Sequence, residues 1–309
     1  MSMWIVFALL LTVMLMVDLG LNRKSHTISF KEALCWSAVW IGLALLFNAG
    51  IWCTMGSVKA LEFFTGYVIE KALSVDNLFV FIMIFSYFGI ANRHQARILK
   101  WGIIGALVMR AIFIFVGIEL VERFSWLLPL FGILLLATAW KMAFGGEGKV
   151  DPARNPMVRL CGKIVPVTKR IRGDWFLKRK GGMIVASPLL LALVMVESSD
   201  VVFAVDSIPA IFAVTLDPFI VFTSNIFAIM GLRALYFLLA NILGMFACLK
   251  YGISFILAFV GVKMIAAVSD FHVPITVSLA IIFTALASSV IASVAISRGR
   301  PKEVTDTLS

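Results

Sequence analysis

The sequence predicts an all-α polytopic membrane protein of about nine transmembrane helices that contains an inverted three-helix repeat. Three observations lead to this fold class: an apolar composition, the spacing of the apolar runs and a likeness between the two halves of the chain. Of the 309 residues, 61% are hydrophobic and 14% are charged, and the mean hydropathy is +1.03. A soluble protein has roughly a quarter of its residues charged. The composition therefore excludes an ordinary soluble enzyme and indicates a protein of the bilayer.

The apolar residues are grouped in nine runs, and a spanning helix needs about 20 such residues. The runs lie at residues 3–21, 33–56, 64–90, 101–121, 125–143, 183–215, 218–240, 252–269 and 273–296. No basic residue precedes the first run, and Arg23 and Lys24 follow it. A cleavable signal peptide has the reverse arrangement, so we expect a transmembrane helix at this position.

The net charge of +10 reflects membrane topology. Most Lys and Arg residues lie in alternate connections between the runs, as expected for cytoplasmic segments. This pattern predicts an N-terminus outside the cell and a C-terminus in the cytoplasm, with the bilayer as a partner and no nucleic acid. The four cysteines form no CxxC pair, so neither a disulfide framework nor a thiolate metal site is expected.

Three short segments of the first half reappear in the same order in the second half. The matches are Val75-Asp76-Asn77-Leu78 with Val205-Asp206-Ser207-Ile208, Met109-Arg110-Ala111 with Leu232-Arg233-Ala234, and Lys141-Met142 with Lys263-Met264. The repeat unit contains three helices, an odd number, so the second copy must enter the membrane from the opposite side. Many secondary transporters have such inverted repeats and place their substrate site near the midplane.

The predicted organisation follows from the runs and the repeat. It comprises two N-terminal transmembrane helices (1–63), repeat A (64–145), a basic cytoplasmic loop (146–181), repeat B (182–270), and a ninth helix with a cytoplasmic tail (271–309).

Ten ionisable residues fall inside the repeat helices, although each charge at the bilayer centre costs roughly 3 kcal/mol. The five bases, which we interpret as charge-balancing, are Lys71, Arg110, Arg233, Lys141 and Lys263. The five acids are Glu70, Asp76, Glu197, Asp200 and Asp206. Such residues are candidates for a functional site, and the alternative is that they neutralise one another as structural ion pairs.

The acids and their polar neighbours form a set of oxygen ligands. The candidate metal ligands are Glu70, Asp76, Asn77, Glu197, Asp200, Asp206 and Ser207. Oxygen ligands suit Mg²⁺, Ca²⁺ and Mn²⁺, whereas Zn²⁺ or Cu⁺ would require His or Cys. Ligand type does not choose among the first three ions.

The spacing of the acids restricts how they can bind one ion. Glu70 and Asp76 are six residues apart, as are Asp200 and Asp206, which on a straight helix means about 9 Å of rise and a 240° turn. One unbroken helix therefore cannot supply both members of a pair. In one arrangement, Asp76 and Asp206 meet near the midplane from opposite copies.

The other arrangement needs a broken helix. The run at 183–215 is long and contains Ser198, Ser199 and Pro209. Proline has no N–H and frees the carbonyl four residues earlier. We expect a helix break at these three residues, with the freed carbonyl either binding a cation or marking a kink that serves packing.

At these residues the sequence resembles the TerC/Alx family of integral membrane proteins, grouped with LysE-type exporters, and within it the bacterial Alx branch. The segments that carry the likeness are Glu70-Lys-Ala-Leu-Ser-Val-Asp76-Asn77, Glu197-Ser-Ser-Asp200-Val-Val-Phe-Ala-Val-Asp206-Ser-Ile-Pro209, and Thr223-Ser-Asn225 through Arg233-Ala-Leu-Tyr236. The likeness extends from about residue 30 to 297. It implies a multi-pass protein of the bacterial inner membrane that exports Mn²⁺, with the five acids listed above as its acidic motif positions.

The predicted function is therefore that of a secondary transporter, which exports a divalent metal ion from the cytoplasm through a midplane carboxylate site. Mn²⁺ is the expected substrate, and Ca²⁺ or Mg²⁺ are the alternatives. Protons are candidate coupling ions because carboxylates that bind metal also bind protons. No enzymatic activity and no cofactor are expected. The alternative is a membrane-embedded scaffold of a metal- or tellurite-stress response complex, without transport.

Overall fold

The chain folds into a bundle of long helices, seen in a computed structural model that describes residues 2–20, 29–145, 155–168, 173, 175–180, 183–240, 248–269 and 273–299. The elements are α1 (Ser2–Gly20), α2 (Phe30–Met55), α3 (Ser57–Tyr87), α4 (Asn92–Arg123), α5 (Leu127–Phe144), α6 (Pro156–Ile164), β1 (Leu177–Lys180), β2 (Met183–Ala186), α7 (Pro188–Phe212), α8 (Pro218–Ile229), α9 (Leu232–Ala240), α10 (Leu249–Ala266), a short 3-10 turn (Ala267–Ser269) and α11 (Ile275–Gly299).

The helices confirm an all-α polytopic membrane protein. Within the described ranges, six helices are long and apolar enough to cross a membrane: α2, α4, α5, α7, α10 and α11. The bent pair α8 and α9 makes a seventh if the two are one span. The apolar part of α1 is shorter, and α3 carries charged residues along its length. Each of the nine predicted runs overlaps one of these helices or the α8–α9 pair.

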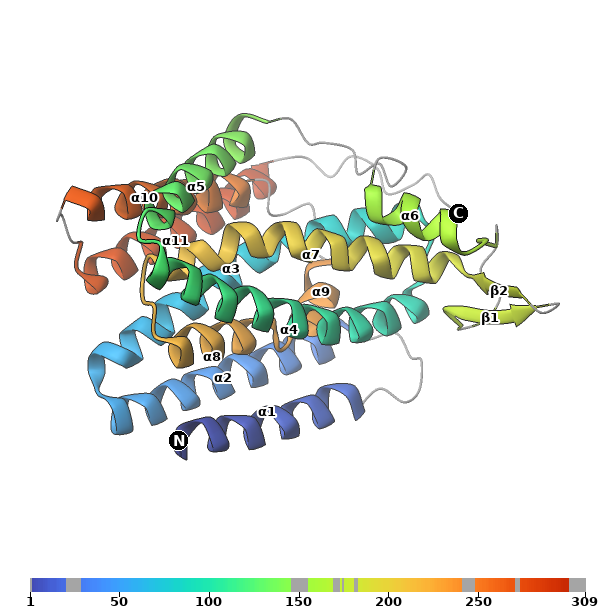
Figure 1. Ribbon diagram of the computed structural model, residues 1–309, viewed down its shortest axis with the longest axis horizontal. Helices are drawn as coiled ribbons and strands as arrows, with labels where there is room; N and C mark the ends of the chain where they lie inside the picture. Colours follow the sequence, from blue (N-terminus) through green and yellow to red (C-terminus); the bar gives the residue numbers. More distant parts are fainter. Residues whose placement is uncertain are drawn as a thin grey trace.

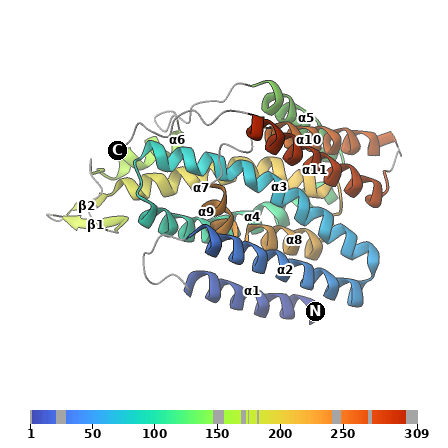
Figure 2. The same ribbon diagram turned by 180° about the vertical axis from the view of Figure 1, so that it is seen from behind.

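The helices form three groups across the bundle (Figures 1 and 2). Helices α1 and α2 lie on one side and α5, α10 and α11 on the other, while α3, α4, α7 and the α8–α9 pair lie between them. The neighbouring helices α3 and α7 run in opposite directions (Figure 1). This middle group holds most of the ionisable residues discussed above.

The expected helix break in α7 is wrong. Helix α7 continues through Ser198, Ser199 and Pro209, and both serine hydroxyls donate to the Met195 carbonyl, at 3.0 and 2.8 Å. A serine that bonds back along its own helix need not interrupt it.

The break lies instead between α8 and α9, which are bent by 40°. Gly231 sits at this bend with φ of +81°, a left-handed conformation that favours glycine. A Cβ on Gly231 would also lie 2.7 Å from the ring of Trp40 in α2. The break therefore requires glycine for two reasons, the left-handed backbone conformation and the close contact with Trp40.

The described part of the predicted loop at 146–181 has structure of its own. Asn155 accepts the N–H groups of Met157 and Val158 and so caps α6, whose first residue is proline. Strands β1 and β2 form an antiparallel hairpin in which Leu177 pairs with Ala186. Residues 146–154 lie outside the described part. We call the end of the bundle with α6, β1 and β2 the hairpin end (Figure 1).

Candidate metal site

A cluster of charged side chains lies in the centre of the bundle, where α3, α4, α7 and α8 meet. Arg110 of α4 is fully buried, and its guanidinium bonds to Glu70 of α3. It also makes a two-pronged contact with Asp200 of α7: Nη2 lies 3.0 Å from Oδ1 and Nε 3.3 Å from Oδ2. Asn225 of α8 is the fourth member, with its Oδ1 3.5 Å from Nη1 of Arg110. We call these four residues the central cluster.

The central cluster joins the two halves of the chain. Glu70 belongs to the predicted repeat A and Asp200 to repeat B, and one guanidinium holds both carboxylates in a form of pairing that is strong and geometrically specific. Arg110 thus has the charge-balancing position predicted for it. One cation for two acids leaves the cluster with an excess of negative charge.

Glu197 lies one turn before Asp200, between α7 and α4, and is half-buried. A Cβ on Gly105 of α4 would lie only 2.2 Å from its carboxylate, whereas a Cβ on Gly102 would lie 3.9 Å away. The missing side chain at Gly105 therefore makes room for a third acid beside the central cluster. A small cavity borders Glu197, Asp200 and Arg233.

A row of buried oxygen atoms extends from the central cluster along α3. Oε2 of Glu70, Oγ of Ser74 and Oδ1 of Asn77 are all buried, and none has a hydrogen-bond partner within the described part of the chain. Spacings of four and three residues place them on one face of α3. Buried polar atoms are normally hydrogen-bonded, so an unpaired row is unusual. Carboxylate, hydroxyl and amide oxygens are ligands that suit a hard divalent cation.

The predicted meeting of Asp76 and Asp206 is not observed. Asp206 accepts a hydrogen bond of 2.9 Å from Thr138 of α5, and no hydrogen bond or ion pair joins it to Asp76 in the ranges that the structure covers. The reason is geometric. Because α3 and α7 are antiparallel and Glu70 and Asp200 meet, a step of six residues moves Asp76 and Asp206 about 9 Å from the cluster in opposite directions.

The carboxylates do not form a complete metal cage in this conformation. No group of three or more His, Cys, Asp or Glu side chains among the described residues is placed to hold one ion. Of the other candidate ligands, Asn77 and Ser207 are buried, and the Ser207 hydroxyl has no hydrogen-bond partner in the same ranges.

Two of the predicted charge-balancing residues have partners outside the central cluster. Lys71 donates to the carbonyls of Ala228 and Met230, at 3.1 and 3.4 Å, and so satisfies carbonyls freed at the end of α8. Arg233 of α9 bonds to Asp18 of α1, with Nη2 3.2 Å from Oδ1 and 2.7 Å from the backbone oxygen.

Asp18 is buried and is not among the residues predicted from the sequence. The sequence does contain a signal for it, since Asp18 is the one acid in the first apolar run. It was missed because it lies near the end of that run and outside the repeats.

The remaining two predicted bases lie near the C-terminal ends of their helices. Lys141 is exposed near the end of α5, and Nζ of Lys263 lies 3.1 Å from the Ser278 hydroxyl in α11. Long side chains near helix ends carry their charge to the membrane surface. Neither lysine bonds to an acid of the central cluster.

A second charged group lies at the end of the bundle opposite the hairpin end. Nζ of Lys59, at the start of α3, lies 3.0 Å from Glu62 and 2.9 Å from Asp217, the residue that caps α8. Thr215 also donates to Glu62, at 2.8 Å. These contacts join the start of α3 to the α7–α8 connection.

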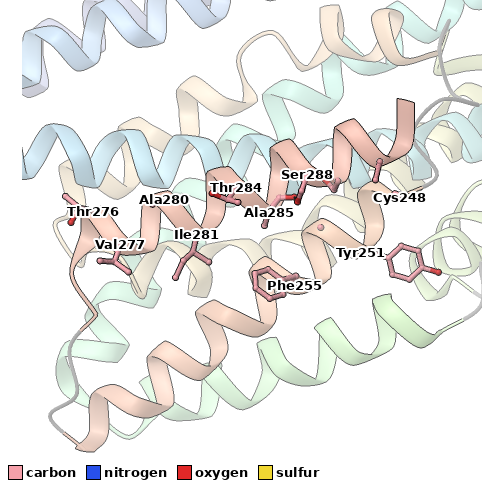
Figure 3. Close-up of a pocket in the computed structure, with 13 residues that line it drawn as sticks. Cys248, Tyr251, Phe255, Thr276, Val277, Ala280, Ile281, Thr284, Ala285 and Ser288 are labelled. Carbon is pink, nitrogen blue, oxygen red and sulfur yellow. The ribbon is translucent and has the colours of Figure 1, made fainter. Parts of the chain in front are cut away.

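A large apolar cavity lies away from the candidate site. It has a volume of about 1040 Å³ and lies between α10 and α11, lined by residues such as Tyr251, Phe255 and Ala280 (Figure 3). Its described lining contains no charged side chain. The side chains that could bind an ion lie in the middle group of helices.

The apolar helices and their buried charges define the class of the protein: it is a multi-pass integral membrane protein with an acid-rich polar centre. Residues 55–301 match the model of the integral membrane protein TerC family. The chain therefore belongs to the TerC family.

Similar proteins cover almost the whole chain. The chain is 48% identical to an uncharacterized membrane protein of Myxococcus xanthus, over 99% of this chain and 96% of that one. Proteins named "Putative membrane-bound redox modulator Alx" are 46% identical in Photorhabdus laumondii (97% of both chains) and 48% identical in Escherichia coli (91% of this chain, 90% of that one). No solved structure matches the chain.

Proposed function

We propose that the protein is a secondary transporter that exports a divalent metal ion, with Mn²⁺ as the expected substrate. The observation that carries the proposal is the central cluster, in which Glu70 and Asp200 come from opposite copies and meet at a buried arginine. Charged side chains inside a membrane are costly and mark ion pathways by default. The choice of Mn²⁺ rests on the resemblance, because the oxygen ligands favour only a hard cation.

The proposed topology has nine spans, with α1 and α3 included and α8–α9 counted as one. The N-terminus lies outside and the hairpin end lies in the cytoplasm of a bacterial inner membrane. The basic residues at the hairpin end support this orientation. The antiparallel course of α3 and α7 supports the inverted repeat, since these are the first helices of the two copies (Figure 1).

In the proposed mechanism, Arg110 holds the site in its metal-free form. A divalent ion would neutralise the two negative charges of Glu70 and Asp200. Its binding would therefore release the guanidinium from at least one of these carboxylates. Glu197 would supply a carboxylate on the cytoplasmic side, and the row of oxygens on α3 would complete the ligands. A proton taken up by a carboxylate could return the site to the metal-free form, which would couple export to proton entry.

The contacts of Lys59 with Asp217 and of Glu62 with Thr215 would keep the outer side closed in this conformation. Transport then requires that α3 and the α7–α8 connection separate. Such rocking of one repeat against the other is the usual form of alternating access. A redox effect, as in the name of the Alx relatives, would follow from export of a redox-active metal ion.

Transport by the purified protein in liposomes tests the proposal. We expect Mn²⁺ uptake, followed with a metal-sensitive dye, to be lost in Glu70→Gln and in Asp200→Asn. Glu119→Gln is the matched control, since Glu119 is an exposed acid of α4. All variants should elute as the wild type does in size-exclusion chromatography. If the wild type moves no ion, or if both cluster variants transport normally, the protein is not this exporter and a scaffold becomes the better account.

A further inference from the structure

Helix α6 lies beside α7 near the hairpin end (Figures 1 and 2). Two contacts attach it. The Nδ2 group of Asn155, its capping residue, lies 2.8 Å from the Ser198 hydroxyl in α7. Val158 packs against the main hydrophobic core. On α7 the attachment point is Ser198, the residue after Glu197.

The side chains of α6 form three distinct strips. Val158 and Cys161 are partly buried, as expected for the strip toward α7. Met157, Leu160 and Ile164, which share another strip, are 56%, 54% and 70% exposed. Arg159 and Lys163 are exposed on a third strip. A helix with one apolar strip and one basic strip, both exposed, is typical of a helix that lies in a membrane interface.

The depth of α6 supports this interpretation. Ser198 lies ten residues after the start of α7, about 15 Å along the helix. Helix α7 has 25 residues and is about 38 Å long, whereas the hydrocarbon core of a bilayer is about 30 Å thick. If the excess length of about 8 Å lies at the hairpin end, the attachment point is about 7 Å inside the hydrocarbon. An interfacial helix buries its apolar face to a depth of about 5–10 Å, so the exposed apolar strip of α6 can contact lipid there.

The hairpin has the same mixture of side chains. Leu177, Met183 and Ile184 are more than half exposed, next to the exposed bases Lys178 and Arg179. Its base is fixed to α4, where the guanidinium of Arg97 lies 5.3 Å from the centre of the Phe176 ring. The exposed bases of α6 and of the hairpin complement an anionic surface.

We propose that α6 and the hairpin dock on the anionic headgroups of the cytoplasmic leaflet. The apolar strip of α6 would enter the lipid, while Arg159 and Lys163 bind headgroup phosphates. Each basic side chain near an anionic membrane contributes about fivefold to docking. The proposal rests on the orientation given above, with the hairpin end in the cytoplasm.

Amide hydrogen exchange of the full-length protein in nanodiscs tests the docking, and it does not depend on transport. The two lipid compositions are pure phosphatidylcholine and phosphatidylcholine with phosphatidylglycerol. We expect exchange in residues 156–164 to be slower in the anionic discs. The double variant Arg159→Glu with Lys163→Glu should reduce that protection by about 30-fold.

The matched control is the double variant Lys31→Glu with Lys250→Glu, which makes the same change of charge away from α6 and should leave the protection of residues 156–164 unchanged. Equal exchange of the wild type in the two lipids would overturn the proposal. So would protection that appears only when a cytosolic protein is added, because the surface would then bind a protein. Normal Mn²⁺ transport without lipid-dependent protection would reject the docking and leave the proposed function standing.

Discussion

Arg110 is the residue on which the polar centre depends. It is fully buried, yet it makes contact with two carboxylates and one amide from three other helices. Breaking a buried ion pair by removing one partner costs about 3–5 kcal/mol, because the remaining charge is left alone. A guanidinium that bridges the two halves of the chain therefore stabilises the protein and also occupies the place where an ion would bind.

Gly105 allows a matched test of Glu197, because the Glu197 carboxylate occupies the space that a side chain at residue 105 would fill. We predict that Gly105→Ala displaces Glu197 and lowers the apparent Mn²⁺ affinity of transport by at least about tenfold, as when the supports of a metal ligand are disturbed.

Gly102→Ala is the control, since its Cβ would lie 3.3 Å from Val196 and 3.9 Å from Glu197. This variant should have a much smaller effect on affinity. Equal effects of the two alanines in the liposome assay would show that Glu197 does not take part in binding.

Among the helices, the bent pair α8–α9 is the main departure from those predicted. The sequence predicts a break at Ser198, Ser199 and Pro209, yet α7 continues through all three residues. At the actual break, Gly231 lies against the ring of Trp40 in α2, and the Lys71 ammonium group of α3 donates to the carbonyls of Ala228 and Met230. A bend held by three helices could not be read from one segment alone.

Gly231→Ala should therefore destabilise the protein more than Gly89→Ala. Both glycines have positive φ, at +81° and +60°, so an alanine costs about 1–2 kcal/mol at either position. Only Gly231 also has a neighbour closer than 3 Å to the added carbon. Thermal unfolding in detergent measures the difference, and an equal shift for both variants would contradict the packing role given to Gly231.

Composition and periodicity are enough to predict an all-α membrane protein, because an apolar run in a bilayer must satisfy its own backbone hydrogen bonds, as a helix does. The acids that would lie inside were also identified. Their partners were not, since Glu70 and Asp200 meet only through the antiparallel packing of α3 and α7. The pair of Asp18 with Arg233 depends likewise on a contact between distant segments, and the hairpin depends on pairing between the predicted loop and the start of repeat B.

The most direct test of the account is to locate the ion. We predict that crystals grown with Mn²⁺ show an anomalous peak at the manganese edge between Glu70 and Asp200, with Arg110 withdrawn from at least one of them. The same peak should be absent in Glu70→Gln. A peak elsewhere, or no peak, with Arg110 still bonded to both carboxylates at saturating Mn²⁺, would contradict the account.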